Sequence, residues 1–223
     1  MQRDASNIWF NMPGVEAAYQ PIAAPSQVAS YQNIGRGRLG TYTAAPGVAP
    51  TWSPPTGWGF NGTTQYLTTG ILPGSNSWTM IVRYRGTPIA GGYLAGSISA
   101  NEQITYSIAT YPTYVLYGNG TEVIKTPSAT EVNVLGIAGL SGYRSGIFDI
   151  ALPGTGVPGY AIYVGGLNLH GISRYGYFVG SIPAFLLVSR PLTAAENWLA
   201  SKQIAYCEQN PDWNAWAPRR RYF

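Results

Sequence analysis

The sequence has little of the side chains on which most enzymes and metalloproteins depend. Its 223 residues include one cysteine, Cys207, and one histidine, His170, and only 10% are charged, against roughly 25% in an average soluble protein. A single cysteine excludes an internal disulfide and a cysteine metal site, and a single histidine excludes a zinc site built on paired histidines. A Ser-His-Asp triad would have to use His170, whose context, 167–172, indicates a strand end or a turn.

Long hydrophobic runs are missing too. No apolar stretch approaches the ~18 residues of a membrane span, so no such span is expected. The opening, Met1–Asn7, lacks the apolar stretch of a signal peptide, so a secreted protein would need a leader outside this sequence. The net charge of +4 arises mainly from three consecutive arginines, Arg219–Arg221. Since nucleic-acid-binding domains carry a basic stripe across one face, no specific nucleic-acid partner is expected.

What the chain does have is alternation and turns. Every second side chain from Trp78 to Tyr84 is large and apolar, the pattern of a strand buried on one face. Within Tyr114–Lys125, Asn119-Gly120 predicts a type I′ hairpin turn. Many short strands with regular turns predict an all-β sandwich or barrel. The further strand-like segments are Gln103–Thr110, Glu131–Leu140, Tyr143–Ile150, Tyr160–Val164 and Tyr177–Ser189.

One segment, about 193–208, predicts a helix. Thr193 and Glu196 have the spacing of a capping box, in which a hydroxyl and a carboxylate bond to the free amides of the first turn. On a helical wheel the apolar residues gather around Trp198, so we expect the helix to pack on the sandwich through this face. Lys202 falls on the same side and Ile204 falls off it.

Two blocks of the sequence resemble one known family of folds. Residues 57–70 (GWGFNGTTQYLTTG) and 77–83 (SWTMIVR) resemble the opening of concanavalin A-like, laminin-G-type domains. Residues 180–197 (GSIPAFLLVSRPLTAAEN) resemble the closing strand and helix of that family. The resemblance implies an all-β, jelly-roll β-sandwich with one C-terminal α-helix.

The resemblance covers about residues 14–208 and leaves an N-terminal tail, 1–13, and an aromatic and arginine-rich C-terminal tail, 209–223. The residues that carry it have structural reasons. Phe60, Tyr66 and Trp78 are expected in the core, and Arg190 is expected to hydrogen-bond to main chain where the last strand meets the helix.

Shorter pieces, 17–21 and 45–52, resemble jelly-roll proteins encoded by tailed bacteriophages and prophages. This resemblance implies a virion component, such as a capsid decoration, head-fibre or tail-associated protein. Its partners would be other virion proteins or copies of itself. It would be made in the host cytoplasm, which suits a chain without disulfides; an extracellular location is the alternative.

The acidic residues are few and scattered. Glycan hydrolysis needs paired carboxylates, but no two of the nine acidic residues are spaced by two or four positions within one strand. The Glu-x-Asp-x-x-Glu motif of concanavalin-like glucanases is absent, so we expect no catalytic residues and no enzymatic activity. Calcium needs six to eight oxygens, carboxylates among them. Asp149 is the sole aspartate in the body of the domain, so no cofactor or metal is expected, and calcium is an unsupported alternative.

Aromatic residues supply the remaining candidates. Exposed tyrosine and tryptophan rings can pack on sugar faces, although tyrosine also serves as an ordinary cross-strand and surface residue. The glycan-binding candidates in loop-like sequence are Trp52, Trp58, Tyr111, Tyr114, Tyr143 and Tyr175.

The two tails have the composition of protein interfaces, in which Tyr, Trp and Arg are enriched, although terminal segments also often fray. The assembly candidates are Trp9, Phe10, Trp213, Trp216, Arg219, Arg220, Arg221, Tyr222 and Phe223.

The sequence therefore predicts a non-enzymatic structural protein of a phage virion, with adhesion to host-surface glycans as a further role. The alternative is a free carbohydrate-binding, lectin-like module. A glycan-active enzyme comes last.

Overall fold

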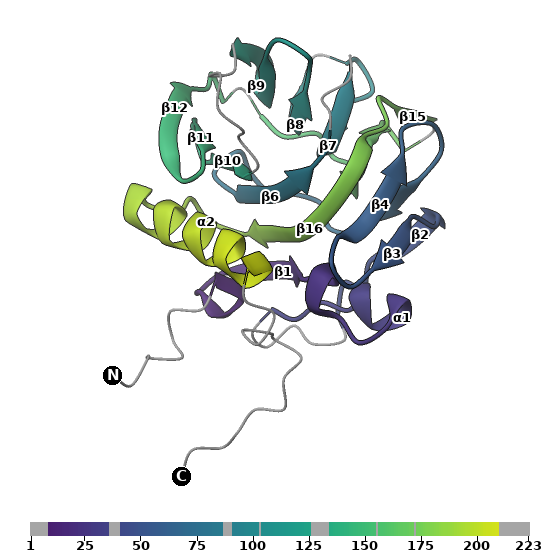
Figure 1. The fold of residues 1–223 in the computed structure, drawn as a ribbon. Coiled ribbons are helices and arrows are strands. Elements are labelled where there is room, and N and C mark those ends of the chain that lie inside the picture. The colour runs from purple at the N-terminus through teal and green to yellow at the C-terminus, as the bar shows by residue number, and fades with distance from the viewer. Residues whose placement is uncertain are drawn as a thin grey trace.

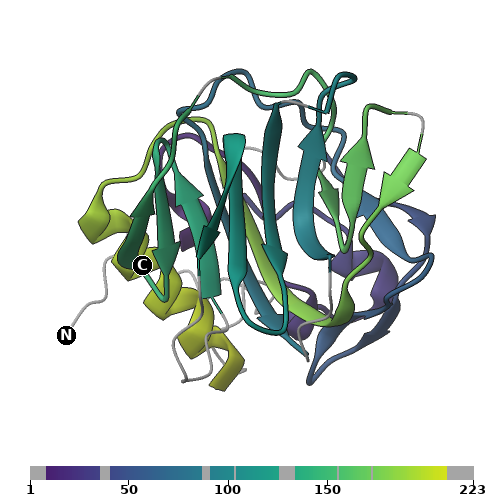
Figure 2. The ribbon, with the colours of Figure 1, turned by 90° about the horizontal axis from the view of Figure 1, so that it is seen from above.

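The computed structural model describes residues 9–35, 41–86, 91–102, 104–125, 134–154, 156–171 and 173–209. Within these ranges the chain forms two β-sheets packed face to face, with the long helix α2 (Ala194–Gln209) against one of them (Figures 1 and 2). The prediction of an all-β sandwich with a C-terminal helix is confirmed.

The sheet that contacts α2, sheet A, has the order β12-β11-β10-β6-β16-β4-β3, and β1 pairs with the second half of β16. Through this pairing, β16, which comes late in the chain, lies next to β1, which comes first among the strands of sheet A. The strands of sheet A are β1 (Val15–Tyr19), β3 (Thr51–Ser53), β4 (Gly57–Asn61), β6 (Thr79–Arg85), β10 (Val134–Ala138), β11 (Ser141–Arg144), β12 (Ile147–Ala151) and β16 (Val179–Val188).

The opposite sheet, sheet B, has the order β15-β14-β7-β13-β5-β2, and β8 and β9 continue it beyond β7. The strand β14 runs parallel to β7, and the other pairings of this sheet are antiparallel. Its strands are β2 (Ala45–Val48), β5 (Tyr66–Thr68), β7 (Gly92–Ile98), β8 (Thr105–Thr110), β9 (Val115–Lys125), β13 (Tyr163–Val164), β14 (Leu167–Leu169) and β15 (Ser173–Tyr175).

The main core lies between the sheets, where alternate side chains of each strand meet. Leu94 of β7 and Phe185 of β16 are fully buried there. The predicted core aromatics fit this picture: Phe60 belongs to the main core, Tyr66 is buried, and Trp78 packs against the core from its rim.

Within the described ranges, three short helices accompany α2: η2 (Trp9–Asn11), η3 (Pro21–Ala23) and α1 (Gln27–Ser30). Among the helices of the described ranges, none has the length and apolar character needed to cross a membrane.

A second core lies on the outer face of sheet A, beneath α2 and η2. Ile81 and Leu186 of the sheet meet Trp9, Phe10 and Ile204 there, and all five side chains are buried. The N-terminal tail was expected to run to residue 13 and to present Trp9 and Phe10 to neighbouring subunits. That expectation is wrong for these two residues, because their rings, 5.5 Å apart, are buried against their own domain.

The buried face of α2 differs from the prediction. Ala200 and Ile204 face the sheet, whereas Trp198 is 49% exposed and carries Lys202 over its ring at 5.9 Å. The reason is the close approach of the helix: a Cβ on Gly146 would lie 2.5 Å from the Trp198 Cα. So narrow a gap accepts small residues and excludes an indole.

The capping box at the start of α2 is confirmed. The Thr193 Oγ1 accepts a hydrogen bond from the Glu196 amide at 3.3 Å, and the Glu196 carboxylate accepts one from the Thr193 amide at 2.9 Å. The expected main-chain bonds of Arg190 are present as well, to the Pro13 and Pro191 carbonyl oxygens at 3.1 and 3.2 Å. The same guanidinium pairs with Glu196 at 2.6 Å.

The predicted hairpin turn at Asn119-Gly120 is wrong, because β9 runs straight through it. The Asn119 side chain is fully buried and donates hydrogen bonds to the Asn76 and Gly139 carbonyl oxygens at 3.0 and 2.6 Å. The asparagine therefore ties two loops to the end of the sandwich, and this tertiary role overrides its local turn preference.

Candidate functional site

The turn between β8 and β9 brings two predicted glycan-binding residues together. The Tyr111 amide donates to the Tyr114 carbonyl oxygen at 2.9 Å, which closes a tight hairpin around Pro112 and Thr113. The rings of Tyr111 and Tyr114 stack with their centroids 4.3 Å apart and their planes 21° from parallel. Both rings are half-buried, and the two residues between them are exposed.

This stack, which we call the tyrosine platform (Tyr111 and Tyr114), rests on a small apolar cluster of sheet B. Tyr93, Ala109 and Leu116 form one row across β7, β8 and β9. They are buried together with Leu167 of β14, and Tyr111 packs against the cluster. The neighbouring residues Leu94 and Ile108 point into the main core, so the cluster and the platform belong to the outer face of sheet B.

The segment between β15 and β16 completes this end of the sheet. The Gly176 carbonyl oxygen accepts a hydrogen bond from the Tyr93 amide at 2.8 Å, and Tyr177 forms a parallel bridge with Tyr93. Tyr175 pairs with Leu167 of the cluster in the register of β14 and β15. Three chain segments that are distant in sequence therefore bring their tyrosines to one region.

The chemistry offered here is that of flat rings and polar tips. A tyrosine has an apolar face and a hydroxyl that can donate and accept hydrogen bonds. Two rings already stacked on each other lose little conformational freedom when a third flat group is added. The arrangement suits a ligand with an apolar ring face and a polar rim, which is the surface pattern of a sugar.

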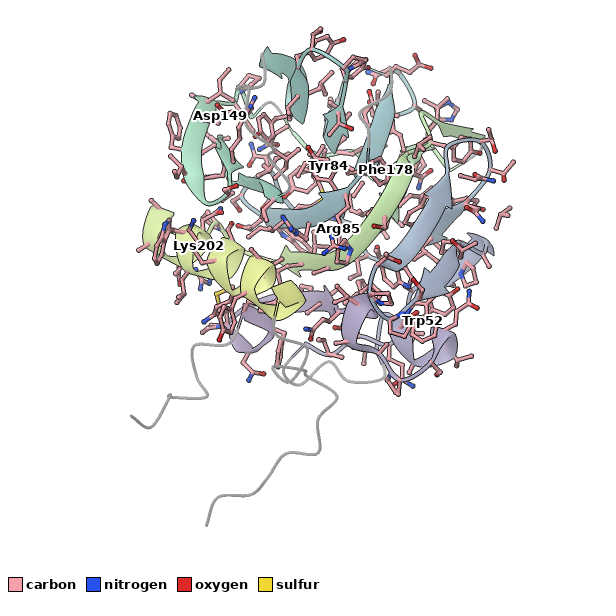
Figure 3. All side chains as sticks on the ribbon, in the orientation of Figure 1. Trp52, Tyr84, Arg85, Asp149, Phe178 and Lys202 are labelled. Carbon is pink, nitrogen blue, oxygen red and sulfur yellow. The ribbon has the colours of Figure 1, made fainter. Side chains whose placement is uncertain are left out.

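The other predicted glycan-binding residues lie elsewhere. Trp58 is fully buried, and its Nε1 donates to the Ser30 Oγ at 2.8 Å, so it cannot contact a sugar. Tyr143 is also buried, on the α2 side of sheet A. Trp52 is half-buried beside α1, far from β8 and β9 (Figures 1 and 3), and donates to the Pro21 carbonyl oxygen at 2.8 Å. Both tryptophans serve the packing of the N-terminal segment.

Sequence reasoning missed Tyr93 and Tyr177. Tyr93 lies inside a strand and gave no loop signal, and Tyr177 stands at a strand start. The available sequence signal was the segment Tyr175-Gly-Tyr177, in which a glycine separates two tyrosines. A second stacked pair, Tyr66 and Tyr163 at 4.9 Å, was also missed.

The C-terminal assembly candidates, Trp213, Trp216, Arg219, Arg220, Arg221, Tyr222 and Phe223, lie outside the described residues.

An ion pair is enclosed where β11 and β12 of sheet A approach β9 of sheet B. Arg144 and Asp149 form an ion pair at 2.8 Å, with side chains only 10% and 11% exposed (Asp149 is labelled in Figure 3). Burial raises the pKa of the neighbouring Tyr117 far above its usual value, and Asp149 raises it further. Burial likewise raises the pKa of Tyr84. Among the described residues, no group of three or more His, Cys, Asp or Glu side chains comes together as a metal site.

Comparisons with known proteins give fold relatives only. No family model matches the sequence, and no curated protein matches it. Among solved structures, a mutant of Trypanosoma rangeli sialidase with trans-sialidase activity superposes with a TM-score of 0.56 at 15% identity. The match covers 86% of this chain and 33% of the sialidase.

Two neurotoxin structures give a similar match. The binding domain of botulinum neurotoxin DC in complex with SialylT has a TM-score of 0.51 at 9% identity, covering 87% of this chain and 52% of that one. A structure of botulinum neurotoxin type C, whose cell entry depends on two ganglioside molecules, has a TM-score of 0.51 at 12% identity. It covers 90% of this chain and 53% of that one. The chain thus spans a third to a half of the length of these structures, and at such identities the likeness shows the β-sandwich fold alone.

The comparisons correct one prediction. The scattered carboxylates led us to expect no enzymatic activity, but 33% of the chain of Trypanosoma rangeli sialidase, and of its mutant with trans-sialidase activity, shares this fold. That expectation relied on the absence of paired carboxylates within a single strand, and the matches to sialidases overturn this absence as a ground for excluding enzymatic activity. The resemblance to phage proteins has no counterpart among the structures named here and stays a prediction.

Proposed function

We propose that this protein binds glycans and that the tyrosine platform is part of the binding site. The observation that carries the proposal is the Tyr111–Tyr114 stack, half-buried at a hairpin tip. Tyr111 of this stack packs against the buried apolar cluster of Tyr93, Ala109, Leu116 and Leu167. The fold relatives support the same class of ligand, since one was solved with SialylT and another enters cells through gangliosides.

The physical basis is preorganisation. The two rings are held by the tight hairpin and by each other, so a sugar face meets a surface that is already ordered. Removing one aromatic anchor of such a site typically costs more than 1 kcal/mol of binding energy, and about 1.4 kcal/mol is a factor of ten in affinity.

The experiment is a glycan array with the full chain, followed by calorimetry with the best ligand. Sialylated and neutral oligosaccharides are both included, and the same samples are analysed for cleavage products. Tyr111→Ala and Tyr114→Ala should each weaken binding by about tenfold. Tyr42→Ala, at a tyrosine 42% exposed outside the platform, is the matched control and should bind normally. Failure of the wild-type chain to bind any glycan would overturn the proposal.

For the biological setting, we propose a phage virion in which other virion proteins or copies of this chain are the partners. Its support is the resemblance of residues 17–21 and 45–52 to phage jelly-roll proteins. An extracellular lectin-like module is the alternative. The two differ in an observable: a virion component co-sediments with particles at fixed copy number, whereas a free lectin remains in the supernatant.

A further inference from the structure

A further tyrosine, Tyr177, lies on the side of β7 opposite the platform. Tyr177 bridges to Tyr93 of β7, Tyr93 pairs with Ala109 of β8, and Ala109 pairs with Leu116 of β9. The adjoining Phe178 and Leu94 are buried in the main core. Because side chains alternate along extended chain, Tyr177 and Tyr93 share the outer face of sheet B with the platform.

Accessibility along this row is uneven. Tyr177 is half-buried, whereas Tyr93 beside it on β7 is only 5% exposed. Tyr111 and Tyr114, in the turn two residues beyond the row, are half-buried as well. From Tyr177 across β7 to β8 is two strand spacings, or about 10 Å. The outer face of sheet B therefore offers two accessible aromatic contacts, Tyr177 and the platform, on opposite sides of β7, and their main-chain separation exceeds the width of one sugar ring.

Gly176 fixes the position of Tyr177 relative to β7. It has a φ of +60°, and a Cβ at this position would lie 2.3 Å from the Gly91 carbonyl oxygen and 2.4 Å from the Tyr93 Cδ2. The Gly176 carbonyl oxygen is also bonded to the Tyr93 amide. Only glycine permits this approach, so the second aromatic contact is held at a set distance from the first.

We infer that the site takes an oligosaccharide of at least two sugar units laid across β7, with one unit on the tyrosine platform and another against Tyr177. This inference rests on the proposed glycan binding. It assigns a substrate class, extended chains over single sugars, to the same site.

The test compares probes of increasing length on the full chain. Calorimetry is run with galactose, sialic acid, lactose and 3′-sialyllactose, using wild type, Tyr177→Ala, Tyr177→Phe, Tyr111→Ala and the control Tyr42→Ala. Thermal unfolding of each variant verifies the fold. Wild type should bind the trisaccharide at least about tenfold more tightly than either single sugar.

The variants distinguish the two contacts. Tyr177→Ala should weaken trisaccharide binding by about fivefold or more and change single-sugar binding less than about twofold. Tyr111→Ala should weaken both, and Tyr177→Phe, which keeps the ring, should retain most of the trisaccharide affinity. Equal binding of single sugars and trisaccharide, or a silent Tyr177→Ala beside a damaging Tyr111→Ala, overturns the extended site and leaves glycan binding intact. Absence of binding to every probe overturns both.

Discussion

Replacing Glu196 by glutamine should destabilise the protein at neutral pH and have much less effect in acid. The Arg190 guanidinium holds the pKa of the Glu196 carboxyl down at about 2, from an ordinary 4.5, with help from the Thr193 amide and hydroxyl. At about 1.4 kcal/mol per pKa unit this shift alone would represent about 3 kcal/mol. Both side chains are a third exposed, at 33% and 34%, and solvent screening of such a pair reduces the figure to about 1 kcal/mol.

The sign follows from the direction of the shift. Since the pKa of Glu196 is lower in the folded protein than in the unfolded chain, the stabilisation is complete above about pH 5 and is lost as the pH falls from about 4.5 to about 2. Less than half of it should remain at pH 3. Glutamine keeps the shape and removes the charge, so the variant should resemble the wild type increasingly as the pH falls.

The assay is denaturant unfolding of wild type and Glu196→Gln at pH 7, 5, 4 and 3. The control is Glu102→Gln, at an exposed carboxylate on the loop after β7, which should leave the free energy of unfolding unchanged. We expect a difference of about 1 kcal/mol at pH 7 that shrinks by more than half at pH 3. A difference that is the same at all four pH values would refute the assignment of the stabilisation to the charged pair.

Two further predictions concern packing. Ile204→Ala, on the buried face of α2, should lower the free energy of unfolding by about 2–4 kcal/mol, whereas Trp198→Ala, on its exposed face, should cost less than about 1 kcal/mol. Thermal and denaturant unfolding of the pair measures this, and a reversed order would show that the helix presents its other face. Tyr106→Phe should raise the free energy of unfolding by about 1 kcal/mol, because the Tyr106 hydroxyl is buried and has no hydrogen-bond partner among the described residues. A loss of stability in the same measurement would contradict that and show that the hydroxyl is bonded in solution.

Features set by near neighbours in sequence were predictable. The capping box needs only Thr193 and Glu196, three positions apart, and the alternation from Trp78 to Tyr84 needs only one strand. The capping box is present as expected. The alternating segment forms the strand β6, but the expectation of one buried face is wrong, because the second core covers its outer face as well. The two tyrosines of the platform could be proposed from the sequence for the same reason, since Tyr111 and Tyr114 flank a single turn.

Features set by distant partners were not predictable. Which face of α2 is buried depends on the close approach of Gly146, between β11 and β12 of sheet A. A helical wheel uses only the sequence of the helix, so it cannot include this contact. Asn119-Gly120 has the sequence of a turn, but the Asn119 side chain bonds to the carbonyl oxygens of Asn76 and Gly139, which are distant in sequence. Tyr93 and Tyr177 are 84 positions apart in the numbering and meet only through the pairing of their segments.

The pairing of β1 with β16 has a consequence for synthesis of the chain on the ribosome. The Ser189 amide donates to the Gly14 carbonyl oxygen at 2.8 Å, and these residues lie 175 positions apart. The strands β1, β4 and β6 emerge early and must all wait for β16, their shared neighbour. Contacts so distant in sequence form slowly, and the waiting strands expose open edges that can pair with other chains. A chain stalled before residue 179 would therefore be a poor candidate for release as a soluble fragment, and the nascent protein has reason to depend on chaperones until its last strand is made.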